Sequence, residues 1–392
     1  MTVSLWRRRN TLGVIRCEAA VIGAGISGIA AALAFERRGI DALVIDRGPL
    51  GFGASTRNAG FLMRGAADNY AFAARHWGRE RAREVWRWTE DNLRLLREEG
   101  IESLATYRAT PSCLLGLEPV EAGELEASDS LMREDGFEVG LIRAGRDAAW
   151  SSGVASVGLV NPHDATINSA DLIAFLGAKL RRPAMLHQEV TGIEIVGVND
   201  VRILTANAEV RCERAMVCTN AFTGLLLPGL REHIHAKRGQ MLAFRTPGRI
   251  FDHAYYANRG GEYFRQATDD VAVLGGWRRF FTDIEVGYED RTTDEVQRGL
   301  ESFMMRVLGG PIDVVARWSG VMGFTPDELP LVGPIDASGR PQPEVTGGPL
   351  WLSAGCTGHG MSIFFKTAGD AVRCMLDGRT STFALAQLVA SV

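Results

Sequence analysis

A strand-turn-helix pattern of apolar and polar positions lies near the start of the chain. Four apolar residues at 19–22 run into the turn Gly23-Ala24-Gly25-Ile26-Ser27-Gly28, and apolar residues then recur at helical spacing through Phe35. A second apolar run, at 42–45, ends in Asp46. Such a turn lets the backbone approach a pyrophosphate at a helix N-terminus, and the acidic residue accepts a hydrogen bond from a ribose. The pattern predicts an adenine-dinucleotide site, and a plain tight turn is the alternative.

The same pattern returns near the other end of the chain. An apolar strand at 350–354 leads into the turn Gly355-Cys356-Thr357-Gly358-His359-Gly360, and apolar positions at 363–375 then share one helical face. This predicts a second helix N-terminus that points out of a glycine turn toward negative charge. His359 is either a structural histidine or a group beside the reacting centre.

The middle of the chain predicts helices first and then an antiparallel sheet. An amphipathic helix spans 78–99, with Gly100 as its C-cap, and Ser169 is placed to cap another helix. Paired strands follow at 190–195 and 201–205. Further strands are predicted at 240–244, 254–257, 262–265 and 271–274. The aromatic residues of this last group are candidates either for the core or for the wall of a substrate pocket.

Two polar segments are candidates for ligand contact. The apolar run at 215–218 stops at Thr219-Asn220, and small polar residues at the carboxyl end of a strand lie where open α/β sheets bind ligands. The glycine-rich stretch 48–60 is followed by the apolar cluster Phe61-Leu62-Met63. It is either a surface loop or backbone wrapped around something flat and buried.

Composition narrows the function classes. The 392 residues allow two domains, and a net charge of -4 gives no reason to expect nucleic acid or an anionic membrane as partner. No apolar stretch reaches the roughly 18 residues of a membrane span. The six cysteines are scattered and histidines are not clustered, so neither a metal site nor a disulfide framework is predicted. A reducing, cytoplasmic location follows from this cysteine usage.

Three motifs together resemble a known family. They are GAGISG with Asp46, GASTRNAG at 53–60 and GCTGHGM at 355–361, and the chain is similar to the FAD-dependent family of D-amino-acid oxidase, glycine oxidase, sarcosine oxidase and γ-glutamylputrescine oxidase. The resemblance implies an α/β fold. A discontinuous, Rossmann-like FAD domain of the glutathione-reductase type is expected at 1–75, 150–228 and 317–392. An α+β substrate domain with a mixed or antiparallel sheet is expected at 76–149 and 229–316.

The resemblance also implies which residues meet the cofactor. The pyrophosphate is assigned to the first turn, the adenosine ribose to Asp46, the adenine to the backbone of Val190, and the flavin ring to the glycine-rich loops. The residues expected at FAD are Gly23, Gly25, Ile26, Ser27, Gly28, Asp46, Arg47, Ser55, Thr56, Arg57, Asn58, Ala59, Gly60, Phe61, Val190, Thr219, Asn220, Gly355, Gly358, His359, Gly360 and Met361.

Family members oxidise a carbon–nitrogen bond by hydride transfer to flavin, and the imine product hydrolyses. The substrate expected here is therefore a small amine or amino acid. The catalytic candidates, chosen by position and chemistry except for the motif residue His359, are Met63, Tyr255, Trp277, Arg278 and His359. A substrate carboxylate would be gripped by Arg64, Arg265 or Arg278, because a guanidinium binds carboxylates bidentately.

Three departures from the sarcosine oxidases carry their own expectations. Ser362 stands where those enzymes have a carboxylate-binding lysine. Gly320 replaces their flavin-linking cysteine, which predicts noncovalent FAD. Leu274 stands in the place aligned with their oxygen-activating lysine, so rapid use of oxygen is in doubt.

The sequence leaves three function classes in view. The first is a flavoenzyme that oxidises an amine with oxygen as acceptor. The second is a flavin dehydrogenase or electron-transfer component that passes electrons to a partner subunit or quinone. The third, an NAD-dependent dehydrogenase, explains the opening turn but leaves the glycine-rich segments at 53–60 and 355–360 without a ligand.

Overall fold

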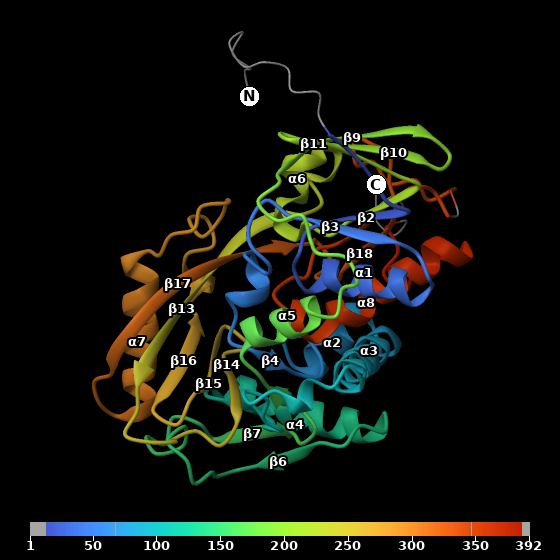
Figure 1. Ribbon diagram of the computed structural model, residues 1–392. Helices are drawn as coiled ribbons and strands as arrows, with labels where there is room; N and C mark the ends of the chain where they lie inside the picture. The colour runs from blue at the N-terminus through green and yellow to red at the C-terminus, as the bar shows by residue number, and fades with distance from the viewer. Residues whose placement is uncertain (1–12, 67, 346, 386–392) are drawn as a thin grey trace.

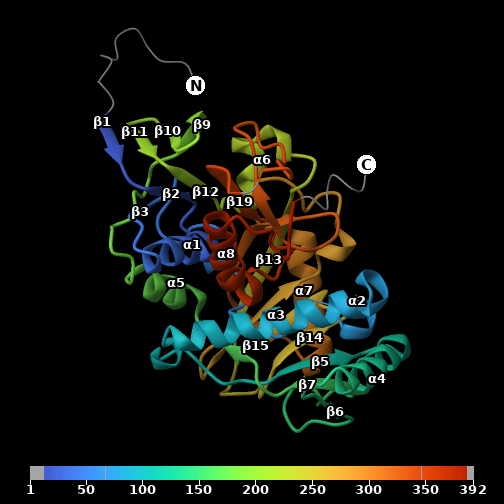
Figure 2. The same ribbon diagram turned by 90° about the vertical axis from the view of Figure 1, so that its right-hand side faces the viewer.

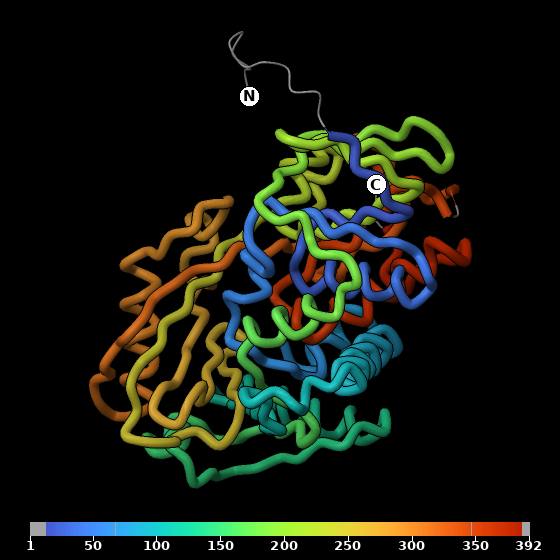
Figure 3. The backbone as a smooth tube through the Cα atoms, in the orientation of Figure 1, coloured from blue at the N-terminus to red at the C-terminus, as the bar shows by residue number. Residues whose placement is uncertain are grey.

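The computed structural model describes residues 13–66, 68–345 and 347–385, and it divides into two halves. One half contains a five-stranded sheet between helices and a smaller sheet, and the other is built on an eight-stranded sheet (Figure 1). The N-terminal and C-terminal segments, blue and red in Figure 3, lie together in the first half, whereas the yellow and orange segments form much of the second.

The five-stranded sheet has the order β18-β19-β12-β2-β3. All neighbours are parallel except β18 and β19. The strands are β2 (Ala19–Ile22), β3 (Ala42–Ile45), β12 (Arg214–Val217), β18 (Leu331–Pro334) and β19 (Leu350–Ala354). Ile22 pairs with both Val217 and Ile45, so the turns after β2, β3 and β12 emerge at one edge of the sheet.

Helices cover one face of this sheet. The helix α1 (Ile26–Arg37) packs beside α8 (Gly360–Asp377), and α3 (Arg79–Glu98) packs against α8 (Figure 2). The shorter helix α5 (Ser169–Gly177) lies against α1. The first and last helices of the described chain thus share one apolar core.

The opposite face is covered by a four-stranded sheet of order β1-β11-β10-β9. Its strands are β1 (Gly13–Arg16), β9 (Val190–Gly197), β10 (Asp200–Thr205) and β11 (Ala208–Cys212). The predicted pairing of 190–195 with 201–205 is present as the antiparallel pair β9/β10.

The second half is built on a mixed eight-stranded sheet of order β17-β13-β16-β15-β14-β5-β7-β6, in which only β14 and β5 are parallel. Its strands are β5 (Ser112–Gly116), β6 (Gly140–Ile142), β7 (Val157–Asn161), β13 (His235–Arg245), β14 (Ala254–Ala257), β15 (Glu262–Gln266), β16 (Val271–Gly276) and β17 (Asp313–Phe324). The helix α7 (Asp294–Leu308) packs on one face, and the other face turns toward the first half (Figure 1).

The remaining elements lie outside these three sheets. Three of them lie in the chain between or beside the halves: β4 (Phe61–Leu62), which pairs with β8 (Ala165–Thr166), and the helices α2 (Tyr70–Trp77) and α6 (Thr223–Leu226). The helix α4 (Pro119–Glu134) instead packs on β5 and β7 of the eight-stranded sheet. Within the described ranges, no helix is long and apolar enough to cross a membrane.

One local prediction is wrong, and three elements were not predicted. The N-cap of α5 is Asn168, whose side chain accepts from Ala170 N, and Ser169 is the first helical residue. The long strand β17 and the helices α4 and α7 were not predicted. The domain division remains a prediction, although β7, which lies inside the range 150–228, pairs with β5 in the eight-stranded sheet.

Candidate active site

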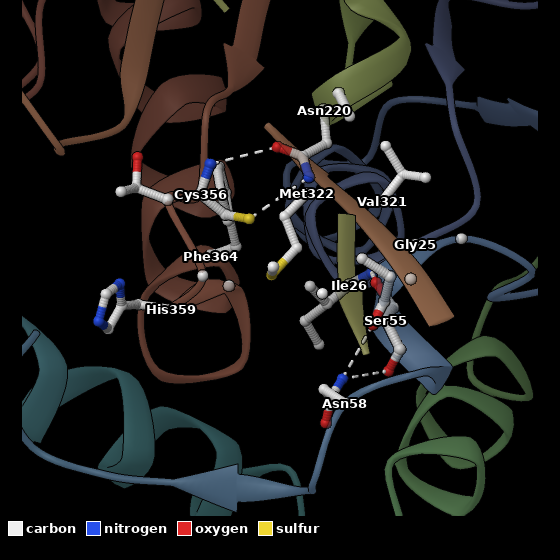
Figure 4. A pocket seen from close by; sticks show the side chains of 18 of the residues that line it. Gly25, Ile26, Ser55, Asn58, Asn220, Val321, Met322, Cys356, His359 and Phe364 are labelled. Atoms are coloured by element: carbon white, nitrogen blue, oxygen red, sulfur yellow. Dashed lines mark hydrogen bonds between the residues drawn. The ribbon is translucent and has the colours of Figure 1, made fainter. Parts of the chain in front are cut away.

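A continuous cavity of about 1030 Å³ runs between the two halves. It begins at the turns after β2 and β3 and extends to Tyr256, Tyr263 and Arg278 at the eight-stranded sheet. Figure 4 shows Gly25 and Ser55 on one side of the cavity, with His359 on the other. This volume lies at the upper end of the roughly 300–1,000 Å³ typical of small-molecule sites.

The turn after β2 requires glycine for steric reasons. Gly23 has a φ of 113°, and a Cβ there would lie 2.6 Å from the carbonyl oxygen of Cys218. A Cβ on Gly28 would overlap the carbonyl oxygen of Gly23. Gly25 instead has an ordinary φ of -84° and faces the cavity, so its missing side chain leaves space there.

Asp46 ties the first turn to the one that follows β3. Its Oδ2 accepts from Ala24 N at 2.6 Å, and its Oδ1 accepts from Gly48 N at 2.7 Å. The carboxylate also lines the cavity, near Gln188 and Val190. Its contact to a ribose remains a prediction.

Eighteen of the 22 residues expected at the cofactor line the cavity. They are Gly23, Gly25, Ile26, Ser27, Asp46, Arg47, Ser55, Arg57, Asn58, Ala59, Phe61, Val190, Thr219, Asn220, Gly358, His359, Gly360 and Met361. Their individual contacts to FAD remain predictions.

The other four residues support the walls. Gly28 packs against Gly23, as described above, and Thr56 Oγ1 donates to Gly51 O at 2.7 Å. Gly60, with a φ of 73°, is pressed against the carbonyl of Ile167. Gly355 is placed so that a Cβ would strike Thr325. These four therefore shape the loops instead of facing the cavity.

The loop before α8 is held by Asn220. The side-chain oxygen of Asn220 accepts from Gly355 N and Cys356 N, both at 3.1 Å, and its amide donates to Cys356 Sγ at 3.3 Å (Figure 4). Ser362, in the first turn of α8, accepts at Oγ from Met63 N at 3.0 Å. The N-terminus of α8 is thereby fixed against the cavity from two sides.

His359 presents an unsatisfied nitrogen at the cavity. Its Nε2 atom is shielded from solvent and has no hydrogen-bond partner among the described residues. Burial lowers the pKa of His359 from 6.5 to about 4, although backbone hydrogen bonds at Thr357 and Cys356 oppose the shift. The imidazole is therefore neutral at physiological pH, and its free Nε2 is available for a hydrogen bond to a ligand.

This shift predicts a pH-dependent stability of the apoprotein. Between pH 6.5 and about 4 the unfolded histidine binds a proton that the folded one does not, so stability falls as pH is lowered through this window. We expect His359→Gln to reduce the loss between pH 7 and pH 5 by about 1 kcal/mol, after allowing for partial exposure. Urea unfolding at both pH values measures it. The exposed His235→Gln serves as control, and equal losses in wild type and His359→Gln would contradict the assignment.

Two of the catalytic candidates do not face the cavity. Tyr255 is fully buried on the α7 side of the sheet, where its hydroxyl donates to Asp147 at 2.5 Å. Trp277 packs against Gly299 of α7. Because neighbouring strand residues point to opposite faces, Tyr256 lines the cavity in place of Tyr255, and Tyr263 lies beside it at 5.8 Å between ring centroids.

Met63 and Arg278 do line the cavity. The guanidinium of Arg278 lies over the Phe324 ring, 4.6 Å from its centroid, and burial lowers its pKa. It has no ion pair among the described residues. A half-buried cation that has no ion pair is available to an anionic group of a ligand.

The other two arginines considered for a carboxylate are committed to the protein. Arg64 is buried and donates to Glu90 at 2.9 Å and to Asn161 at 2.6 Å. Arg265 is buried and donates to the carbonyl oxygens of Ala59 and Ile167. Neither lines the cavity, so only Arg278 of the three remains a candidate.

The residues present fit FAD. The long cavity joins a glycine turn at the N-terminus of α1, where Ser55 Oγ accepts from Ile26 N at 3.0 Å, to the loop at the N-terminus of α8, which has no side-chain cap. Two helix N-termini at the ends of one elongated cavity suit a ligand with separated negative charges. Within the described part of the chain, no group of three His, Cys, Asp or Glu is arranged to hold a metal ion.

Comparisons with known proteins agree with this geometry. The family model described as FAD dependent oxidoreductase matches residues 18–369. Glycine oxidase from Pseudomonas aeruginosa is 24% identical over 360 residues, which cover 87% of this chain and 90% of that protein. Gamma-glutamylputrescine oxidoreductase from Escherichia coli is 21% identical over 392 residues, covering 94% and 85% respectively.

Solved structures share the fold. L-proline dehydrogenase from P. horikoshii superposes with a TM-score of 0.75 at 16% identity, covering 94% of this chain and 95% of that one. Glycine oxidase from Geobacillus kaustophilus gives a TM-score of 0.74 at 18% identity, with coverages of 95% and 98%. With the family model matching most of its length, this chain belongs to the FAD-dependent oxidoreductase family, and its cofactor is FAD.

Proposed function

We propose that this enzyme oxidises the carbon–nitrogen bond of an amine or amino acid. The observation that carries the proposal is the continuity of the cavity, which joins the glycine turn at Gly25 to Tyr256, Arg278 and His359. Cofactor and substrate would therefore meet in one enclosed space. The matched relatives carry the names glycine oxidase and gamma-glutamylputrescine oxidoreductase, which fit the same chemistry.

Bound FAD would supply the reaction by accepting a hydride from the carbon next to the substrate nitrogen. The N-terminus of α8 favours negative charge near Gly358 and Met361 by roughly 0.3–1 kcal/mol. A substrate amine has to lose its proton before it can give up a hydride. The neutral His359, with Nε2 unbonded, is suited to accept a hydrogen bond from the deprotonated amine and so to orient it.

The chain's other cavity groups would position the substrate. Burial raises the pKa of Tyr263 to about 12, so its hydroxyl stays protonated and can donate a hydrogen bond. Tyr256 is perturbed in the same direction by burial, which raises its pKa. Arg278 would hold a substrate carboxylate. Tyr256 and Phe61, with ring centroids 5.2 Å apart, form an aromatic part of the cavity wall.

We propose that FAD is held without a covalent bond. Gly320, which lines the cavity, offers no thiol. The cavity-lining cysteines, Cys218 and Cys356, are buried, and burial raises the pKa of both thiols. A thiol that stays protonated is a poor nucleophile. A cytoplasmic location stays a prediction from the cysteine usage of the sequence.

Anaerobic reduction of the flavin tests the function. The holoenzyme is mixed, without oxygen, with N-methyl amino acids, D-amino acids, L-proline, and diamines with their acylated derivatives. We expect the absorbance near the flavin maximum to bleach with at least one of these classes, because each offers an oxidisable carbon–nitrogen bond. Bleaching by none of them would overturn the proposal.

The electron acceptor has two candidates, and one observation favours the second. Oxygen is the acceptor in an oxidase. However, no lysine of the described chain lines the cavity directly: Lys237 reaches the ring of the lining residue Phe324, with its Nζ 4.7 Å from the centroid, and Leu274 is buried on the α7 face of the sheet. This arrangement favours a dehydrogenase that passes electrons to a partner protein or quinone. Hydrogen peroxide formed in step with substrate consumption under air would support oxygen, whereas its near absence would support the dehydrogenase.

A further inference from the structure

The substrate end of the cavity holds a carboxylate that forms no ion pair among the described residues. Asp68 lies directly before α2 and lines the cavity. Asn69 donates to its Oδ1 twice, from the backbone at 2.7 Å and from the side chain at 3.1 Å. No hydrogen bond to Oδ2 and no ion pair of Asp68 is found among the described residues.

Two arginines near this end of the cavity are paired with Glu124. Arg75 pairs with Glu124 at 2.7 Å, and Arg259 pairs with the same carboxylate at 2.8 Å. Glu124 is thus satisfied by two cations while Asp68 has none. Burial raises the pKa of Asp68 to about 7, and the charge of Arg259 offsets this only partly. A desolvated carboxylate that has no ion pair is stabilised when a ligand brings a cation to it.

The surroundings of Asp68 also suit an ammonium group. Phe72 and Trp77 of α2 line the cavity together with Asp68. Trp77 is fixed by its indole N–H, which donates to Asp327 O at 3.0 Å, and Glu328 follows in the same loop and lines the cavity. Aromatic faces attract cations, most strongly those of tryptophan. Aromatic and carboxylate groups thus stand together on one wall of the cavity.

A simple monoamine would not use this wall. Its one nitrogen is needed at the reacting centre, so the molecule has no second cation to offer Asp68. A second ammonium group on the substrate would form an ion pair with Asp68, as Arg75 and Arg259 do with Glu124. The cation lacking in the protein would then come with the ligand.

We propose, building on the proposed amine oxidation, that Asp68 selects substrates with a second ammonium group distant from the nitrogen that is oxidised. The substrate class is then diamines and basic amino acids in preference to monoamines and neutral amino acids of the same length. Trp77 contributes its ring to the same distal group.

Matched ligands that differ only in the distal ammonium test this inference. The pairs are 1,4-diaminobutane with butylamine, and lysine with norleucine in both enantiomers. Binding to the holoenzyme is measured from the shift of the flavin absorbance and of the melting temperature, so it does not depend on oxidation. In the wild type we expect at least tenfold tighter binding of the charged member of at least one pair.

Asp68→Asn should remove this preference and leave butylamine or norleucine binding within about threefold of wild type. The matched control is Asp252→Asn, since Asp252 is exposed and does not line the cavity; it should keep the preference. Equal binding of both members of every pair by the wild type would overturn the inference, and so would a preference that survives in Asp68→Asn.

The outcomes for the two proposals can be separated. An Asp68-dependent preference in binding, with no bleaching by any amine, would overturn the proposed oxidation and keep the subsite. Bleaching by monoamines and diamines alike, with no preference in binding, would overturn the subsite and keep the oxidation.

Discussion

Gly25→Val is expected to abolish FAD binding at cofactor concentrations that saturate the wild type. A Cβ at this position would lie 2.8 Å from Ser55 Oγ, and the valine methyl groups would occupy cavity space at the N-terminus of α1. That is where the pyrophosphate needs to approach the backbone. We expect the dissociation constant to rise at least about 100-fold, or roughly 2.7 kcal/mol. Titration of apoprotein with FAD, followed by quenching of flavin fluorescence, measures it.

The fold should survive this change. Gly25 has a φ of -84° and a ψ of -173°, which valine adopts without strain. The matched control is Gly123→Val, at an exposed position of α4 where an added Cβ would meet nothing within 4 Å. Circular dichroism and the apoprotein melting temperature would check both variants. Binding by Gly25→Val within tenfold of wild type would show that this turn does not hold the pyrophosphate.

Arg278→Met is expected to separate substrates that carry a carboxylate from those that do not. The guanidinium is half-buried, has no ion pair among the described residues and faces the cavity. Loss of one partner from a desolvated charge pair costs upward of about 2 kcal/mol, so kcat/KM for amino acids should fall roughly 30- to 150-fold. Activity toward amines without a carboxylate should change little. Steady-state or anaerobic kinetics with both classes measure the difference.

Two variants accompany this test. Arg278→Lys keeps the charge but loses the planar fork, so an intermediate loss is expected. Arg298→Met, on the exposed face of α7, should leave both substrate classes unaffected. If Arg278→Met slows both classes equally, the residue does not recognise a carboxylate.

The residues expected at the cofactor are positioned mainly by short turns that follow buried strands. Sequence motifs could therefore predict them. Gly23 and Gly28 are fixed by contacts within one turn or with the adjacent strand, and Asp46 follows directly from the end of a buried strand. Each of these contacts joins residues of one turn, or joins a turn to a neighbouring strand that the sequence shows as an apolar run. The same holds for α8, whose N-terminus follows a glycine turn.

The substrate half depends on tertiary packing, and the sequence predicted less of it. Choosing between Tyr255 and Tyr256 requires knowing which face of β14 meets α7, because alternation alone does not say which face is buried. One signal was present: Gly299 lies within the helical pattern of α7, and the space it leaves is filled by Trp277. Asp68 belongs to no motif. It differs from Glu124 because Arg75 and Arg259, which are far from Glu124 in the sequence, pair with that carboxylate and not with Asp68.

The side-by-side packing of α1 and α8 has a consequence for how the enzyme is made in the cell. The cofactor turn, which precedes α1, is synthesised long before its partner helix α8. A nascent chain that stops before α8 has the dinucleotide turn without the loop that closes the other end of the cavity. Uptake of FAD should therefore wait until α8 has been made, and the yellow colour of a preparation would report the fraction of chains in which α8 has docked.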